Sequence, residues 1–159
     1  MAKSPKPRAR TASRVAAVQA LFQSEQAGDS AETVIDQFVR HRLGELPGAG
    51  GFEDGRVPDA EVPLFQRVVR AAVLQQSEID ALLAETLPAD WPIARLDPVL
   101  RAVLRAGTAE LRMKDEAPPA KVVINEYLDI ARGFFTGAEP GLANAVLDRL
   151  ARSLRIGEF

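Results

Sequence analysis

Five of the chain's 20 basic side chains, and none of its 22 acidic ones, lie within the first fourteen residues. This segment carries a net charge of +5, and the rest of the chain carries -7. A basic arm on an acidic body is typical of a protein that contacts a polyanion at one place. The alternative is a solvated terminal tail without a function. The basic residues are Lys3, Lys6, Arg8, Arg10 and Arg14.

The spacing of the arginines favours RNA as the polyanion. Arg10 and Arg14 are four residues apart, so in a helix they share one face, and Arg8 and Lys6 precede them. Guanidinium groups bind phosphate through two nitrogens and also stack on unpaired bases, which favours single-stranded RNA over a duplex groove. No helix-turn-helix, zinc-finger or RNP motif is present to indicate a sequence reader of DNA.

Residues suited to catalysis or metal binding are scarce. His41 is the only histidine and lies between Arg40 and Arg42, which favours a surface residue over a catalytic one. There is no cysteine, and no glycine-rich motif that would hold a phosphate group. We therefore expect a non-enzymatic protein without a metal or a cofactor. The acids of the central loop lack the spacing of a calcium-binding loop: Glu53, Asp54, Asp59 and Glu61.

Apolar residues recur every three or four positions along most of the chain, which predicts an all-α fold with seven helices. The expected helices cover roughly 8–27, 30–46, 64–73, 77–87, 98–111, 119–134 and 142–154. Pro5 and Pro7 are expected to keep the first residues extended. Gly28 should end the first helix, and Ser30 and Asp97 should cap the second and fifth.

The predicted organisation is a single domain of two helical subdomains, roughly 1–46 and 63–159, divided by a Gly/Pro-rich loop. It consists of a partly disordered basic arm (1–13), N-terminal helices (14–46), a Gly/Pro-rich loop (47–63) and the remaining helices (64–159). No apolar run is long enough to span a membrane and no apolar core of a signal peptide follows the N-terminus, so a cytoplasmic protein is expected. Asn125 and Asn144 lie within apolar helical segments; they either tie the last two helices together or, for Asn144, approach a ligand.

Read in order, four segments resemble the NusB family of bacterial transcription antitermination factors. The first helix reads ARTASRVAAVQALFQSE, with an arginine-rich opening before an AVQALY-like run. The fifth reads RLDPVLRAVLRAGTAELR, and the sixth reads PPAKVVINEYLDIAR, close to the family pattern P-x-K-V-x-I-N-E. The seventh reads LANAVLDRLAR, similar to the family stretch F-V-N-G-V-L-D-K. The resemblance covers nearly the whole chain and implies a NusB-like helical bundle.

The resemblance also implies a function and a set of contacts. The protein would bind the boxA element of ribosomal RNA transcripts together with a small-subunit ribosomal protein (NusE). The pair would join the RNA polymerase antitermination complex and suppress premature termination. RNA contacts are implied for Lys6, Arg8, Arg10, Arg14, Glu139 and Asn144, and contacts with the ribosomal protein for Phe22 and Leu100.

The turn before the seventh helix departs from the family pattern. Leu142 stands where a phenylalanine is common, and Ala145 where a glycine is common. A leucine cannot stack on a base as an aromatic ring does. Glu139 is therefore the polar contact that we expect this turn to retain.

Two alternative functions use the same helices. The domain also resembles the N-terminal RNA-binding region of certain ribosomal RNA cytosine methyltransferases, although the 159 residues contain no GxGxxG motif. The other alternative is a helical scaffold that binds only proteins and carries an inert tail. A homodimer of the free protein is a further possibility, because an acidic body and a basic arm attract one another.

Overall fold

The computed structural model describes residues 5–43 and 61–159, with the side chains of 5–8 left out. Lys3, Leu46 and most of the Gly/Pro-rich loop, with Glu53, Asp54 and Asp59, lie outside the described residues. In the described ranges, no helix is long and apolar enough to cross a membrane.

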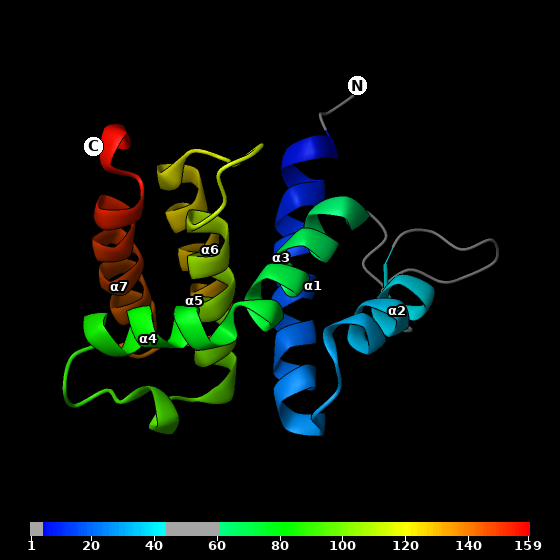
Figure 1. The fold of residues 1–159 in the computed structure, drawn as a ribbon, viewed down its shortest axis with the longest axis horizontal. Helices are drawn as coiled ribbons and strands as arrows, with labels where there is room; N and C mark the ends of the chain where they lie inside the picture. The colour runs from blue at the N-terminus through cyan, green and yellow to red at the C-terminus, as the bar shows by residue number, and fades with distance from the viewer. Residues whose placement is uncertain (1–4, 44–60) are drawn as a thin grey trace. The chain divides into compact units, whose positions relative to one another are not determined.

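The described residues form seven α-helices, which confirms the predicted all-α fold (Figure 1). Two short 3-10 helices, η2 (Ile93–Arg95) and η3 (Ile156–Glu158), accompany them. The chain divides into two compact units, residues 1–73 and 74–159. The α-helices are α1 (Pro5–Ala27), α2 (Ala31–His41), α3 (Val62–Leu74), α4 (Gln76–Thr86), α5 (Pro98–Leu111), α6 (Ala120–Phe134) and α7 (Glu139–Leu154).

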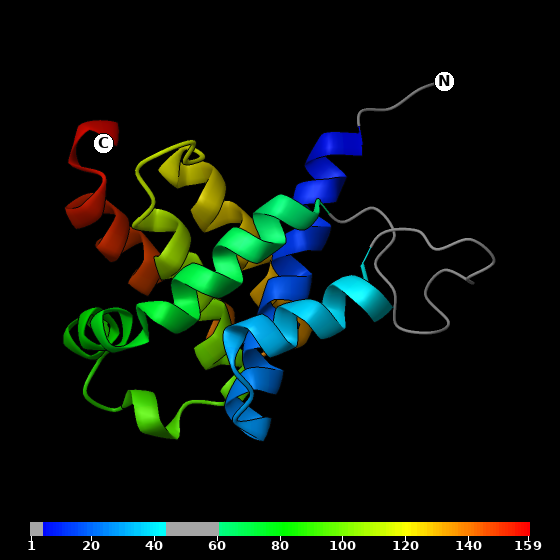
Figure 2. The same ribbon diagram turned by 45° about the vertical axis from the view of Figure 1, so that its right-hand side comes forward.

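In the first unit, local signals define the turn between α1 and α2. Gly28 has φ of +75°, a left-handed conformation that favours glycine, and it ends α1 as predicted. The Ser30 hydroxyl then accepts a hydrogen bond from the Thr33 amide at 3.2 Å and caps α2, also as predicted. Because the turn is short, α2 folds back and packs against α1 (Figure 2).

Helix α3 belongs to the first unit, whereas the sequence predicted a division at the Gly/Pro-rich loop. The rings of Phe38 in α2 and Phe65 in α3 stack with their centroids 5.6 Å apart. Arg70 donates two hydrogen bonds to the Glu32 carboxylate, at 2.7 and 3.0 Å. This pairing lowers the pKa of Glu32 and raises that of Arg70. The division falls after α3 because these contacts join it to α2.

Two helix boundaries in this unit differ from the predicted ones. Helix α1 begins at Pro5 instead of Arg8, so Pro5 and Pro7 are not extended. Proline is compatible with the first turn of a helix, where the backbone amides have no intrahelical partner. Helix α2 ends at His41, and Leu43 is buried beyond its end instead of within it.

In the second unit, α5, α6 and α7 pack against one another, and α4 crosses α5 and α7 (Figure 1). Asp97 caps α5 as predicted, since its carboxylate accepts a hydrogen bond from the Val99 amide at 2.8 Å. A Cβ atom on Gly107 would lie 3.0 Å from Leu147 of α7 and 3.4 Å from Tyr127 of α6. Glycine therefore permits the close approach of α5 to both helices.

Other contacts in this unit involve polar groups. Arg105 binds both carboxylate oxygens of Asp80, at 2.9 and 2.8 Å, and so joins α5 to α4. The Tyr127 hydroxyl donates a 2.6 Å hydrogen bond to the buried carboxylate of Glu110. Val122 is exposed although it belongs to the apolar run of the predicted sixth helix, because the buried side of α6 is formed by its neighbour Val123 and the residues spaced from it.

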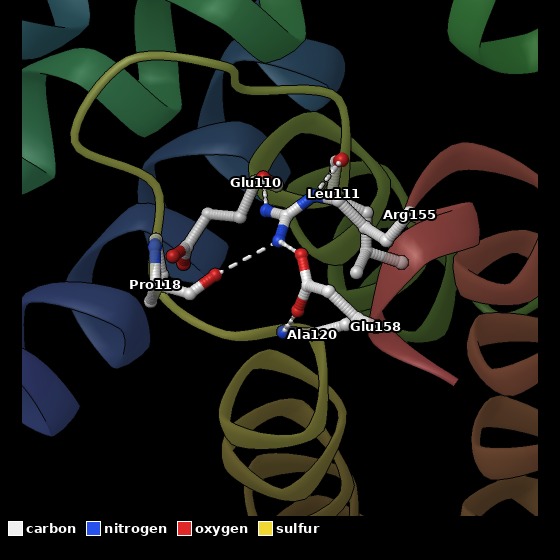
Figure 3. A network of polar contacts seen from close by, with 6 residues as sticks. All are labelled: Glu110, Leu111, Pro118, Ala120, Arg155 and Glu158. Atoms are coloured by element: carbon white, nitrogen blue, oxygen red, sulfur yellow. Dashed lines mark hydrogen bonds and ion pairs between the residues drawn. The ribbon is translucent and has the colours of Figure 1, made fainter.

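The C-terminus is held by a polar network around Arg155 (Figure 3). Its guanidinium donates to three backbone carbonyls, those of Glu110 and Leu111 at the end of α5 and that of Pro118 before α6, at 2.8–3.1 Å. It also pairs with Glu158, whose other carboxylate oxygen accepts from the Ala120 amide at 2.7 Å. The last residues thus tie α7 to the end of α5 and the start of α6.

Candidate nucleic-acid interface

Among the basic residues of the first fourteen whose side chains are described, Arg10 lies at the surface. Its side chain is 52% exposed on the first half of α1. Its Nε lies 3.6 Å from a carboxylate oxygen of Glu61, which directly precedes α3. A half-exposed guanidinium can exchange such a contact for a phosphate oxygen. Lys6 and Arg8 lie one turn earlier in α1, where the backbone alone is described.

The position of Glu61 beside Arg10 is set by Ser13, which is fully buried. The Ser13 hydroxyl accepts a hydrogen bond from the Glu61 amide at 2.6 Å. It lies 2.7 Å from the Glu61 carbonyl and 2.9 Å from the Ala9 carbonyl, the two possible acceptors of its single proton. The backbone at the start of α3 is therefore attached to α1 next to Arg10.

Arg14 does not share the exposed face that the sequence predicted for it. The residue is 2% exposed, although it lies four positions after Arg10. It falls in line with Ala17, Val18 and Leu21, which are also buried, so the buried stripe of α1 extends one turn further than expected. The spacing of 14, 18 and 21 could have indicated this in the sequence. In this conformation Arg14 is not available to a phosphate group.

The two residues predicted to meet a protein partner have opposite environments. Phe22 is 37% exposed near the C-terminal end of α1, which leaves part of its ring free for a contact. Leu100 is 0% exposed in α5, so in this conformation it offers no surface to a partner. The helix α5 is buried almost continuously from Ala102 to Leu111, and Leu100 belongs to the same core.

In the second unit, α7 begins at Glu139, inside the segment that was predicted to be a turn. Glu139 lies in the first turn of α7, where the helix dipole favours a negative charge. Leu142 is half-buried and Asn144 is exposed. Asn125 is exposed as well, so burial does not support the predicted tie between Asn125 and Asn144.

An aromatic residue in this region was missed by the sequence reasoning. Phe134, the last residue of α6, is 46% exposed, and its ring centroid lies 6.5 Å from that of Phe135. The sequence signal that could have indicated it is the pair of adjacent phenylalanines directly after Gly133, at the predicted end of the sixth helix. Large exposed rings near a polar helix start can stack on nucleic-acid bases.

The remaining polar candidates are His41 and the acidic residues of the described chain. His41 is exposed at the end of α2, as predicted for a surface residue. In residues 5–43 and 61–159, no three His, Asp or Glu residues come close enough to hold a metal ion.

Comparisons with known proteins agree with the sequence pattern. The NusB family matches residues 11–152. A transcription antitermination protein NusB of Granulibacter bethesdensis is 70% identical over 152 residues, covering 96% of this chain and 93% of the relative. The corresponding protein of Gluconobacter oxydans is 51% identical over 97% of this chain and 93% of its own.

Solved structures show the same fold. T. maritima NusB superposes with a TM-score of 0.69 at 26% identity, covering 96% of this chain and 93% of that one. A chain from a complex of antitermination factors NusB and NusE with double-stranded RNA superposes with a TM-score of 0.68 at 21% identity, covering 92% and 98%. The arginine-rich first helix, the INE segment of α6 and the seven-helix fold therefore have one explanation: the chain belongs to the NusB family.

Proposed function

We propose that this protein is a cytoplasmic transcription antitermination factor that binds boxA-type single-stranded RNA together with the small-subunit ribosomal protein NusE. The pair would join the elongating RNA polymerase and reduce premature termination. The observation that carries the proposal is the 70% identity, over nearly the full length of both chains, with a relative named as a transcription antitermination protein.

The first helix offers separate surfaces for the two partners. Arg10 is exposed near its start and Phe22 near its end. They are twelve positions apart, which corresponds to roughly 18 Å along the helix axis. An RNA backbone at Arg10 and a protein at Phe22 can therefore bind at the same time without competing for one site.

The end of α6 and the start of α7 offer a second RNA contact, in the second unit. Asn144 supplies an exposed amide and Phe134 an exposed ring. We propose that Phe134 provides the base-stacking surface that Leu142, being half-buried and aliphatic, does not. Glu139 would contact a base amino group or a sugar hydroxyl, because a carboxylate does not bind phosphate.

The direct test is a titration of fluorescent boxA-type RNA with the protein, with and without the NusE-type ribosomal protein. We expect the ribosomal protein to tighten RNA binding, and RNA to tighten the protein pair by the same factor, since coupling is reciprocal. If the ribosomal protein left the RNA affinity unchanged, the proposed joint binding of RNA and ribosomal protein (the adaptor function) would be excluded.

Replacing Arg10 separates this function from a scaffold that binds only proteins. The adaptor function predicts that Arg10→Ala weakens RNA binding and reduces the slope of log affinity against log salt by about 0.7 for one lost contact with single-stranded RNA. Phe22→Ala should instead weaken binding of the ribosomal protein. A scaffold with an inert tail would respond to the Phe22 change alone.

A further inference from the structure

We propose that Glu61 is an internal competitor of the RNA backbone for Arg10. In the free protein its carboxylate lies 3.6 Å from the Arg10 guanidinium, where an RNA phosphate would bind. RNA must therefore displace Glu61 before it can pair with Arg10. This inference rests on the proposed RNA-binding function, and it assigns to Glu61 a role in setting the RNA affinity.

The competitor is held in place by the fold. Glu61 is 48 positions away from Ser13 in the sequence, yet the Ser13 hydroxyl contacts both its amide and its carbonyl, at 2.6 and 2.7 Å. Ser13 itself is fully buried, so this attachment is not a chance surface contact. The backbone of Glu61 is thereby fixed one turn away from Arg10, and its carboxylate has a high local concentration there.

The contact is suited to exchange because it is weak. The two side chains are 52% and 37% exposed, and the N–O distance is 3.6 Å. Arg70 and Glu32, in the same unit, form a contrasting pair with two hydrogen bonds at 2.7 and 3.0 Å, which joins α2 to α3. A single, longer and exposed ion pair contributes little to folding, and a phosphate with two free oxygens can replace it.

Displacement also changes the charge near the RNA. While Glu61 pairs with Arg10, the two side chains have no net charge at this position. Once RNA has bound, the released carboxylate lies close to the phosphate and repels it. Both effects oppose RNA binding, and their sum corresponds to about a two- to fivefold reduction in affinity for an exposed pair.

The test is a double-mutant cycle of Glu61→Gln and Arg10→Ala, read by RNA titration at 0.15 M salt. Glutamine keeps the size of the side chain and leaves the backbone contacts with Ser13 intact. We expect Glu61→Gln to tighten RNA binding about two- to fivefold in the wild-type background, and by clearly less in the Arg10→Ala background, where only the repulsion between carboxylate and phosphate remains to be removed.

Two control variants remove the same charge elsewhere. Glu85→Gln removes an exposed acid of α4, which belongs to the second unit. Glu32→Gln frees a different arginine, Arg70, in the same unit as Arg10. Neither variant should tighten RNA binding as much as Glu61→Gln does.

The outcomes separate this inference from the proposed function. If Arg10→Ala weakens RNA binding but Glu61→Gln does not strengthen it, the competition is excluded and RNA binding by Arg10 stands. Equal tightening by Glu61→Gln with and without Arg10 would also overturn the inference, because it would be a general charge effect. If Arg10→Ala leaves the RNA affinity unchanged, the proposed role of Arg10 fails with it.

Discussion

Arg155 and Glu158 form a 2.7 Å ion pair at the C-terminus, and each also binds backbone groups of other helices (Figure 3). Arg155 donates to the last two carbonyl groups of α5, those of Glu110 and Leu111, which no amide within that helix can reach. Glu158 satisfies the first amide of α6. The pair thus joins the ends of two helices that the sequence separates, and it makes the C-terminal residues part of the second unit.

The pH dependence of thermal stability should reveal how much the ionised carboxylate of Glu158 stabilises the fold. The Ala120 amide, and then Arg155, hold the pKa of this carboxyl group below its ordinary value of 4.5. A lowered pKa in the folded state means that the contribution to stability is complete above pH 4.5 and is lost as the pH falls through the folded-state pKa. We expect Glu158→Gln to lower the Tm at pH 7, and the difference from wild type to shrink in acid.

The measurement is thermal unfolding by circular dichroism from pH 7 to pH 3. Glu85→Gln serves as the control, because Glu85 is exposed on α4. A Tm difference for Glu158→Gln that stays constant over this range would show that its ionisation does not stabilise the fold.

Replacing Arg14 should reduce folding stability, whereas replacing Arg10 should leave it nearly unchanged. Arg14→Ala removes a buried arginine and should lower the free energy of unfolding by about 1–3 kcal/mol, since its buried polar contacts are lost. Arg10→Ala should change it by less than about 0.5 kcal/mol, because its ion pair is exposed. Chemical denaturation measures both. A stable Arg14→Ala variant with reduced RNA affinity would restore the role that the sequence predicted for it.

Leu100 and Phe22 offer a second contrast. Leu100→Ala creates a cavity in the core and should cost about 2–5 kcal/mol of folding stability. Phe22→Ala should cost less, because 37% of this residue is exposed, and should instead weaken binding of the ribosomal protein. Denaturation combined with a pull-down or calorimetric titration separates the two effects. Our assignment of Leu100 to the core would be contradicted by a Leu100→Ala variant of unchanged stability.

Phe134 should contribute to RNA binding through its ring. Phe134→Leu keeps an apolar side chain of similar exposure but removes the aromatic face, and should weaken RNA binding by about 1–3 kcal/mol if one base stacks there. Phe134→Tyr keeps the ring and should retain the affinity. Both variants should unfold near the wild-type temperature, because Phe134 is 46% exposed. Equal affinities of the leucine and tyrosine variants would exclude stacking.

Local sequence signals determined the helices of this protein and most of their ends. Gly28, Ser30 and Asp97 act through their own backbone conformation or through bonds to residues nearby in the chain. Such effects do not depend on the rest of the fold, so the predictions made from them were correct. The order of the motifs along the chain likewise indicates the NusB family without the structure.

Which side of a helix is buried was decided by the tertiary structure. Arg14 has a residue type that favours the surface, yet it is buried, because burial depends on which helices pack against that position. The contact of Glu61 with Arg10 and Ser13 joins residues about 50 positions apart, and no local pattern encodes it. Sequence therefore determined the elements and the family, whereas long-range packing decided which charged and apolar side chains remain free to bind.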